Sequence, residues 1–111
     1  MTRILRVAGA QMAGTQRDAP RAHTLARMLA LLEQAAARGA KLVVFPELAF
    51  TTFFPRWLFE TTQELDRYFE SAMPNPNVQP LFDRARELAI GFYVGYAELA
   101  PDGKRFNTAI L

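Results

Sequence analysis

Residues 41–48 read Lys-Leu-Val-Val-Phe-Pro-Glu-Leu, and they decide the fold of the chain. The apolar run from Leu42 to Phe45 is typical of a short strand that is buried on both faces, as in a parallel sheet. Pro46 has no backbone N–H and therefore ends the strand. Glu47 then stands just past the carboxyl end of that strand, where open α/β sheets collect ligands and catalytic groups.

The segments before residue 41 complete a strand–helix–strand unit. The apolar run in residues 4–12 predicts a first strand. A helix is predicted from Pro20, which suits a first turn, to Gly39, which suits a helix end. Its apolar residues repeat at helical spacing: Leu25, Met28, Leu29, Leu32 and Ala36. Two strands joined by a helix in this way are typical of a parallel sheet.

The residues after Leu48 extend the pattern. We expect a loop with four aromatic residues over 47–57, amphipathic helices over 62–72 and 78–89, and a strand over 91–99. Residues 101–104, Pro-Asp-Gly-Lys, predict a hairpin turn into a fourth strand over 105–111. The expected order is β-α-β-α-α-β-β, an α/β fold with a mixed, mostly apolar sheet and helices on one face.

The composition fits a single domain over residues 1–111. Half of the residues are apolar, so we expect a packed core, and 13 Lys and Arg against 11 Asp and Glu give a net charge of +2. The basic residues are scattered, which argues against a nucleic-acid partner. No apolar run is long enough to cross a membrane and no signal peptide is recognisable, so we expect a cytoplasmic protein without a membrane partner.

Two residue types that often carry chemistry are scarce. Cysteine is absent and His23 is the only histidine. These residues therefore cannot form a disulfide, a thiolate metal site or a multi-histidine site. A cysteine nucleophile is also excluded within residues 1–111.

Glu47 is the strongest catalytic candidate by position. We expect it to lie among apolar side chains, namely those of Phe45, Leu48, Phe50 and Phe53. An apolar setting raises the pKa of a carboxyl group and makes it a competent general base near neutral pH. Phe53 and Phe54 are candidates to line a substrate pocket beside it. The alternatives are a solvated loop carboxylate or helix cap for Glu47, and ordinary core packing for the phenylalanines.

Several segments also resemble one enzyme family. Residues 44–48, Val-Phe-Pro-Glu-Leu, are similar to the glutamate motif of the nitrilase superfamily of carbon–nitrogen hydrolases, which have an αββα sandwich and a Glu-Lys-Cys triad. Residues 46–57 resemble more closely the branch that hydrolyses N-carbamoyl-D-amino acids, and residues 51–57, Thr-Thr-Phe-Phe-Pro-Arg-Trp, are the part more specific to that branch. The same branch is resembled at residues 73–76, 80–82, 91–92, 95–99 and 105–108.

The resemblance implies the N-terminal part of an αββα sandwich and a specific reaction. An N-carbamoyl-D-amino acid would be hydrolysed to the D-amino acid, ammonia and carbon dioxide. Glu47 would be the general base, a cysteine the nucleophile and a lysine the oxyanion donor. The resemblance implies no metal or cofactor, a small N-carbamoyl amino acid as substrate, and a homo-oligomer for the full-length protein.

The lysine and cysteine motifs of the superfamily have no counterpart in residues 1–111. Lys41 opens a strand and Lys104 lies in a turn, so only Glu47 carries over. We therefore expect the chain to be the N-terminal part of a carbon–nitrogen hydrolase domain, inactive by itself. Two alternatives stay open: a non-catalytic remnant of such a domain, or another branch such as a ureidopropionase, an amidase or a nitrilase.

Overall fold

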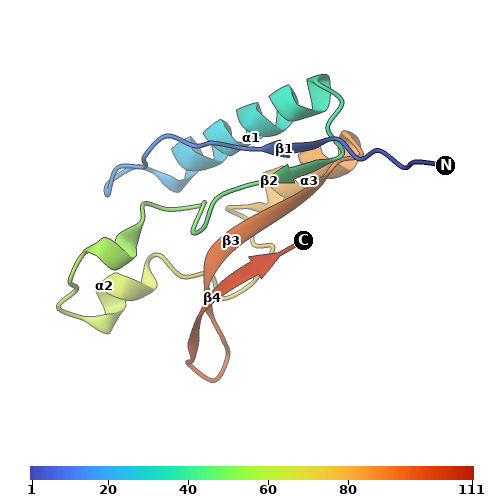
Figure 1. The fold of residues 1–111 in the computed structure, drawn as a ribbon. Helices are drawn as coiled ribbons and strands as arrows, with labels where there is room; N and C mark the ends of the chain where they lie inside the picture. Colours follow the sequence, from blue (N-terminus) through green and yellow to red (C-terminus); the bar gives the residue numbers. More distant parts are fainter.

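The computed structural model describes all residues from Met1 to Leu111 (Figure 1). In chain order its elements are β1 (Val7–Gly9), α1 (Arg21–Ala37), β2 (Leu42–Val44), the 3₁₀ helix η1 (Phe54–Arg56), α2 (Thr62–Asp66), α3 (Gln79–Glu87), β3 (Gly91–Leu99) and β4 (Arg105–Ile110). This order agrees with the predicted one, and β3 has the predicted bounds. The longest helix, α1, has 17 residues, and no helix combines the length and apolar character needed to cross a membrane.

The strands form one mixed sheet in the order β1-β2-β3-β4. β1 pairs in parallel with β2, and β2 pairs in parallel with β3. Helices connect both of these pairs, as a parallel arrangement requires. β4 returns antiparallel beside β3 after a tight turn, which the hydrogen bond from Ala100 N to Lys104 O closes at 2.9 Å. The predicted α/β class with a mixed sheet is confirmed.

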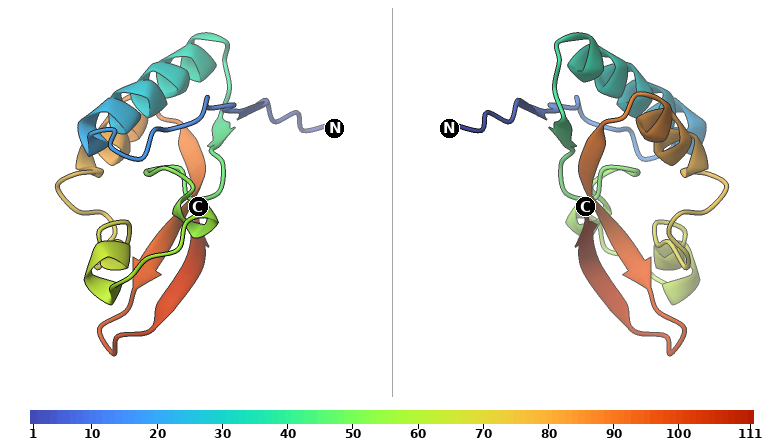
Figure 2. Two further views of the ribbon diagram at one scale, coloured as in Figure 1. Left: turned by 90° about the vertical axis from the view of Figure 1, so that its left-hand side faces the viewer. Right: turned by 90° about the vertical axis from the view of Figure 1, so that its right-hand side faces the viewer.

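Helices α1 and α3 lie together on one face of the sheet, as predicted (Figure 2). The core between them and the strands holds fully buried side chains from both layers, among them Met28, Leu32, Leu81, Val43 and Val94. Along β3 the side chains alternate, so that Phe92 and Val94 are buried while Tyr93 between them is exposed. The apolar stripe predicted for the first helix therefore faces this core through Met28 and Leu32.

The opposite face of the sheet is reached by neither α1 nor α3. Its apolar side chains stay accessible: Val7 is 55% exposed, Val44 40% and Tyr93 41%. One face of the sheet is therefore a packed core, and the other presents apolar side chains to the surroundings.

β1 is shorter than the strand predicted over residues 4–12. Its partner β2 has only three residues, because Pro46 follows closely and cannot donate a backbone hydrogen bond. The pairing ends at two hydrogen bonds, Lys41 N to Arg6 O and Ala10 N to Val44 O, both 2.8 Å long. The residues before Arg6 extend away from the sheet and are exposed (Figure 1).

The helix predicted over residues 62–72 is also shorter, because α2 ends at Asp66. The following residues turn back so that Glu70 forms a parallel bridge with Glu98 of β3. Glu70 N donates to Ala97 O at 2.7 Å, and Leu99 N donates to Glu70 O at 2.9 Å. This pairing replaces the last helical turns, which the periodicity of the sequence could not reveal.

Candidate active site

Glu47 lies beside β3, just beyond the carboxyl end of β2. Its backbone is held on both sides, since Phe45 N donates to Tyr93 O at 2.8 Å and Ala49 N donates to Gly95 O at 3.0 Å. The segment therefore continues along the edge of β3 that β2 occupies, although Pro46 interrupts the strand. The position agrees with the expectation that a carboxylate stands at the carboxyl end of a parallel strand.

Gly95 allows this close approach. A Cβ atom at residue 95 would lie 3.1 Å from the Glu47 Cα and 3.3 Å from the Leu48 backbone N. Both are backbone atoms that cannot rotate away. Leu48 itself has a φ of +48°, a left-handed conformation that residues other than glycine rarely adopt. The backbone around Glu47 is thus tightly constrained on both its strand side and its C-terminal side.

The Glu47 side chain makes one hydrogen bond. Asn107 of β4 donates from Nδ2 to Glu47 Oε1 at 2.5 Å, across 60 residues of sequence. The register of the hairpin explains the contact, because Asn107 pairs with Ala97, two residues beyond Gly95 on β3. The segment that follows β2 and the strand β4 are therefore joined through this carboxylate.

An open depression of about 360 Å³ adjoins Glu47. Its lining consists of Glu47, Leu48, Phe53, Phe54, Pro55, Phe69, Ala97, Arg105, Phe106 and Asn107. The rings of Phe53 and Phe106 are about half exposed, at 50% and 48%. Apolar rings beside a single carboxylate form a surface suited to a small, partly apolar molecule.

Phe53 and Phe54, the two residues predicted to line a pocket, both contact this depression but differ in burial. Phe54 is only 5% exposed, and its ring stacks on Tyr68 with 5.1 Å between centroids. Phe53 presents half of its surface. Phe54 thus belongs to the floor, whereas Phe53 has surface free for a ligand.

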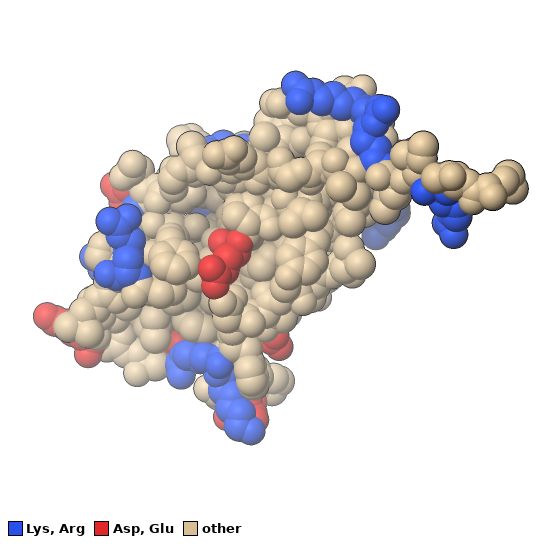
Figure 3. Space-filling model, viewed as in Figure 1, with Lys and Arg blue, Asp and Glu red and all other residues tan.

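Glu47 is exposed rather than enclosed by apolar side chains, contrary to the expected setting. Phe45 and Phe50 are buried in the core instead of surrounding the carboxylate. Figure 3 shows the face of the molecule that is turned to the viewer in Figure 1. Its charged side chains lie mostly at the margins, with one acidic patch near the centre. The only other charged residue of the depression, Arg105, is bound to Asp66, with Nε and Nη2 at 2.9 and 2.7 Å from Oδ1.

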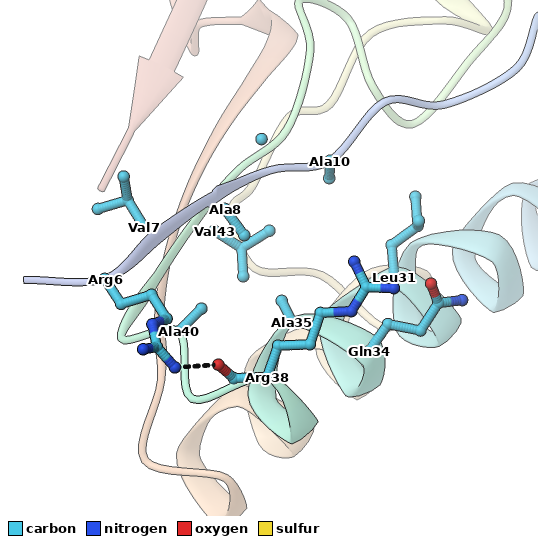
Figure 4. A pocket seen from close by; sticks show the side chains of 11 residues that line it. Arg6, Val7, Ala8, Ala10, Leu31, Gln34, Ala35, Arg38, Ala40 and Val43 are labelled. Atoms are coloured by element: carbon cyan, nitrogen blue, oxygen red, sulfur yellow. Dashed lines mark hydrogen bonds between the residues drawn. The ribbon is translucent and has the colours of Figure 1, made fainter.

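A separate depression of about 370 Å³ lies between β1 and the C-terminal half of α1 (Figure 4). Its walls are mainly alanine and aliphatic side chains, including Ala8, Leu31 and Val43. At one end Arg6 donates from Nη1 to the Arg38 backbone O at 2.7 Å. It contains no carboxylate, imidazole or hydroxyl group that could transfer a proton, so it is a weaker catalytic candidate than the Glu47 depression.

The other polar groups near the site were only partly predictable from local sequence patterns. The Asn107 contact with Glu47 depends on the hairpin register, for which the turn at residues 101–104 was the available signal. A buried cluster was missed entirely: Glu70 is 5% exposed, pairs with Arg21 and accepts from Asn75 Nδ2 at 2.8 Å. This cluster ties the start of α1 to the segment after α2, and its groups are all hydrogen-bonded, so we assign it a structural role.

Comparison with known proteins gives two findings. The sequence model of the carbon-nitrogen hydrolase family matches residues 6–111. Among solved structures, the chain is similar to a glutamine-dependent NAD+ synthetase from Acinetobacter baumannii, with a TM-score of 0.52 and 20% identity over 86% of this chain. The match covers only 16% of the synthetase chain, and at this identity it supports the fold alone.

Proposed function

Because the chain belongs to the carbon–nitrogen hydrolase family, we propose that the whole protein hydrolyses a carbon–nitrogen bond of a small amide-like substrate, with Glu47 as the general base. The observation that carries this proposal is the position of Glu47. It lies past the carboxyl end of β2, faces an open depression, and is held by a neutral amide that leaves its charge uncompensated. A carboxylate in this setting can accept a proton and return it.

The proposed reaction uses a thiolate. Glu47 takes the proton of a cysteine thiol, the sulfur attacks the carbonyl carbon, and the proton passes to the departing nitrogen. Glu47 then takes a proton from a water molecule whose oxygen attacks the sulfur-bound carbonyl carbon, and returns that proton to the cysteine sulfur as the carbon–sulfur bond breaks. A lysine ammonium would stabilise the tetrahedral oxyanion. No cysteine occurs in residues 1–111, so the proposal concerns the whole protein, to which these residues contribute the base.

For the substrate we propose an N-carbamoyl-D-amino acid, which would give the D-amino acid, ammonia and carbon dioxide. The support is the resemblance of residues 46–57 to that branch of the superfamily. The half-exposed rings of Phe53 and Phe106 agree with an apolar side chain on the substrate, since aromatic surfaces are stabilised by contact with apolar groups.

The test is ammonia release from N-carbamoyl-D-phenylalanine by the protein expressed from its native gene. Glu47→Gln keeps the size of the side chain and removes the base, so we expect turnover to fall by about 10²- to 10⁴-fold with the fold unchanged. Glu60→Gln is the matched control, because Glu60 is exposed and lies outside the depression. It should retain wild-type turnover.

The same assay separates the branches. Turnover of N-carbamoyl-β-alanine, of simple amides or of nitriles in place of the D-amino acid derivative would replace the proposed substrate but keep Glu47 as the base. Equal rates for Glu47→Gln and wild type would overturn the role of Glu47. Absence of turnover on every one of these substrates would support a non-catalytic remnant.

A further inference from the structure

The Glu47 carboxylate is anchored by a single group that lies far away in the sequence. Asn107 Nδ2 is the only side-chain donor that contacts it, and Oε2 has no partner within the chain. The backbone on either side is fixed by the hydrogen bonds of Phe45 and Ala49 to β3, and Gly95 lies against the Glu47 Cα. The remaining freedom is therefore in the side-chain torsions of Glu47, and the Asn107 amide restricts them.

The Asn107 side chain that holds Glu47 is a neutral amide, and this affects the charge of the carboxylate as well as its position. An amide nitrogen donates a hydrogen bond without carrying charge, whereas an ammonium or guanidinium would neutralise the base. The one cation of the depression, Arg105, donates twice to Asp66 and is thereby held away from competing for Glu47. The arrangement keeps one oxygen bound and leaves the other free to exchange a proton.

We propose that Asn107 is a positioning residue for Glu47: its amide fixes Oε1 and leaves Oε2 available in the depression. This inference rests on the proposed function, because it assigns Asn107 a role in the same proton transfers. Asn107 acts through Glu47 and not on the substrate. Its loss should therefore affect the rate of the chemical step more than substrate binding.

The first test is the kinetics of Asn107→Ala in the protein expressed from its native gene. We expect kcat to fall by about 10²-fold with KM changed less than about twofold, because misplacing a reacting group by an ångström costs about that much. Asn107→Gln retains the amide and, as residue 107 is exposed, has room for the longer side chain, so it should recover part of the rate. Asn77→Ala is the matched control at an exposed asparagine outside the depression, and should match wild type.

The second test needs no turnover. The side-chain amide signals of asparagine are followed by ¹⁵N NMR in wild type and Glu47→Gln. We expect the Asn107 amide proton signal to move upfield when the carboxylate is removed, and the Asn77 signal to stay in place. Such a result would support the anchoring contact even in a protein without measurable activity.

The two tests separate the inference from the proposed function. An unchanged Asn107 signal in Glu47→Gln overturns the inference whether or not the protein is active. Wild-type kcat in Asn107→Ala, or a loss confined to KM, also overturns it. A protein that turns over no carbon–nitrogen substrate contradicts the proposed function and, with it, the positioning role of Asn107 in proton transfer. A shifted Asn107 signal would then leave the contact as a structural one.

Discussion

The two hydrophobic clusters of the molecule differ in size and in how they are built. The helix-side core contains 15 buried residues contributed by α1, α3, the strands and the loops that adjoin them. The Glu47-side core contains three, Leu48, Phe54 and Ala97, with partly buried aromatic and apolar residues around them. The first is assembled mainly from regular elements, whereas the second depends on a loop, a short helix and one strand.

We expect the helix-side core to contribute most of the free energy of unfolding, and the Glu47-side core to support the exposed candidate site. The helix-side core has most of the fully buried side chains and is covered by α1 and α3. The Glu47-side core supports the depression with few buried contacts, so segments around it should open at lower free energy than the helix-side core. The constraint on Glu47 comes instead from backbone hydrogen bonds, Gly95 and Asn107.

Leu32→Ala tests the helix-side core and should give the largest effect. Leu32 is completely buried, so its truncation removes apolar contacts and leaves a cavity, which costs about 2–5 kcal/mol of unfolding free energy. The measurement is urea-induced unfolding followed by circular dichroism. Leu58→Ala is the matched control, because Leu58 is 96% exposed and its loss should change stability by at most about 0.5 kcal/mol. Equal midpoints for the two variants would show that the helix-side core does not dominate stability.

Gly95→Ala tests the constraint beside Glu47 and should have an intermediate effect. The added methyl group would press on the Glu47 Cα and the Leu48 N, so we expect a loss of about 1–3 kcal/mol and a displaced Glu47. Gly91→Ala on the same strand is the control, since its Cβ would find no atom closer than 3.7 Å. Unfolding and ammonia release are measured on both variants. Equal stability and equal ammonia release in Gly95→Ala and Gly91→Ala would show that the close packing of Gly95 on Glu47 contributes to neither.

The helix-side core could be predicted from the sequence, whereas the surroundings of Glu47 could be predicted only in part. Met28 and Leu32 recur at helical spacing, so the helix-side core was evident from local periodicity. Glu47 was placed correctly at the end of β2 by the run of Val43 and Val44 followed by Pro46. Its exposure, and the contact with Asn107, depend on the sheet register across 60 residues, which no local pattern encodes.

The smallest effect is expected at the solvent side of the helix-side core, where Glu33 of α1 pairs with Arg84 of α3. The hydrogen bond from Arg84 holds the pKa of Glu33 below its usual value, against a smaller opposing effect of desolvation, and the charge of Arg84 lowers this pKa further. A pKa that is lower in the folded than in the unfolded state stabilises the protein above the unfolded value, and this contribution is lost as the pH falls through the folded value.

Urea unfolding of wild type and Glu33→Gln, measured as a function of pH, tests whether this contribution to stability is lost on acidification. Wild type should be slightly more stable at neutral pH, and the difference should disappear as the pH falls through the lowered pKa of Glu33. The difference should also shrink in high salt, because both side chains are exposed enough to be screened. Glu60→Gln, which removes a carboxylate without an ion pair, should show no such difference. A gap between wild type and Glu33→Gln that widened on acidification would contradict the assignment, and would place the coupling between α1 and α3 in their apolar contacts alone.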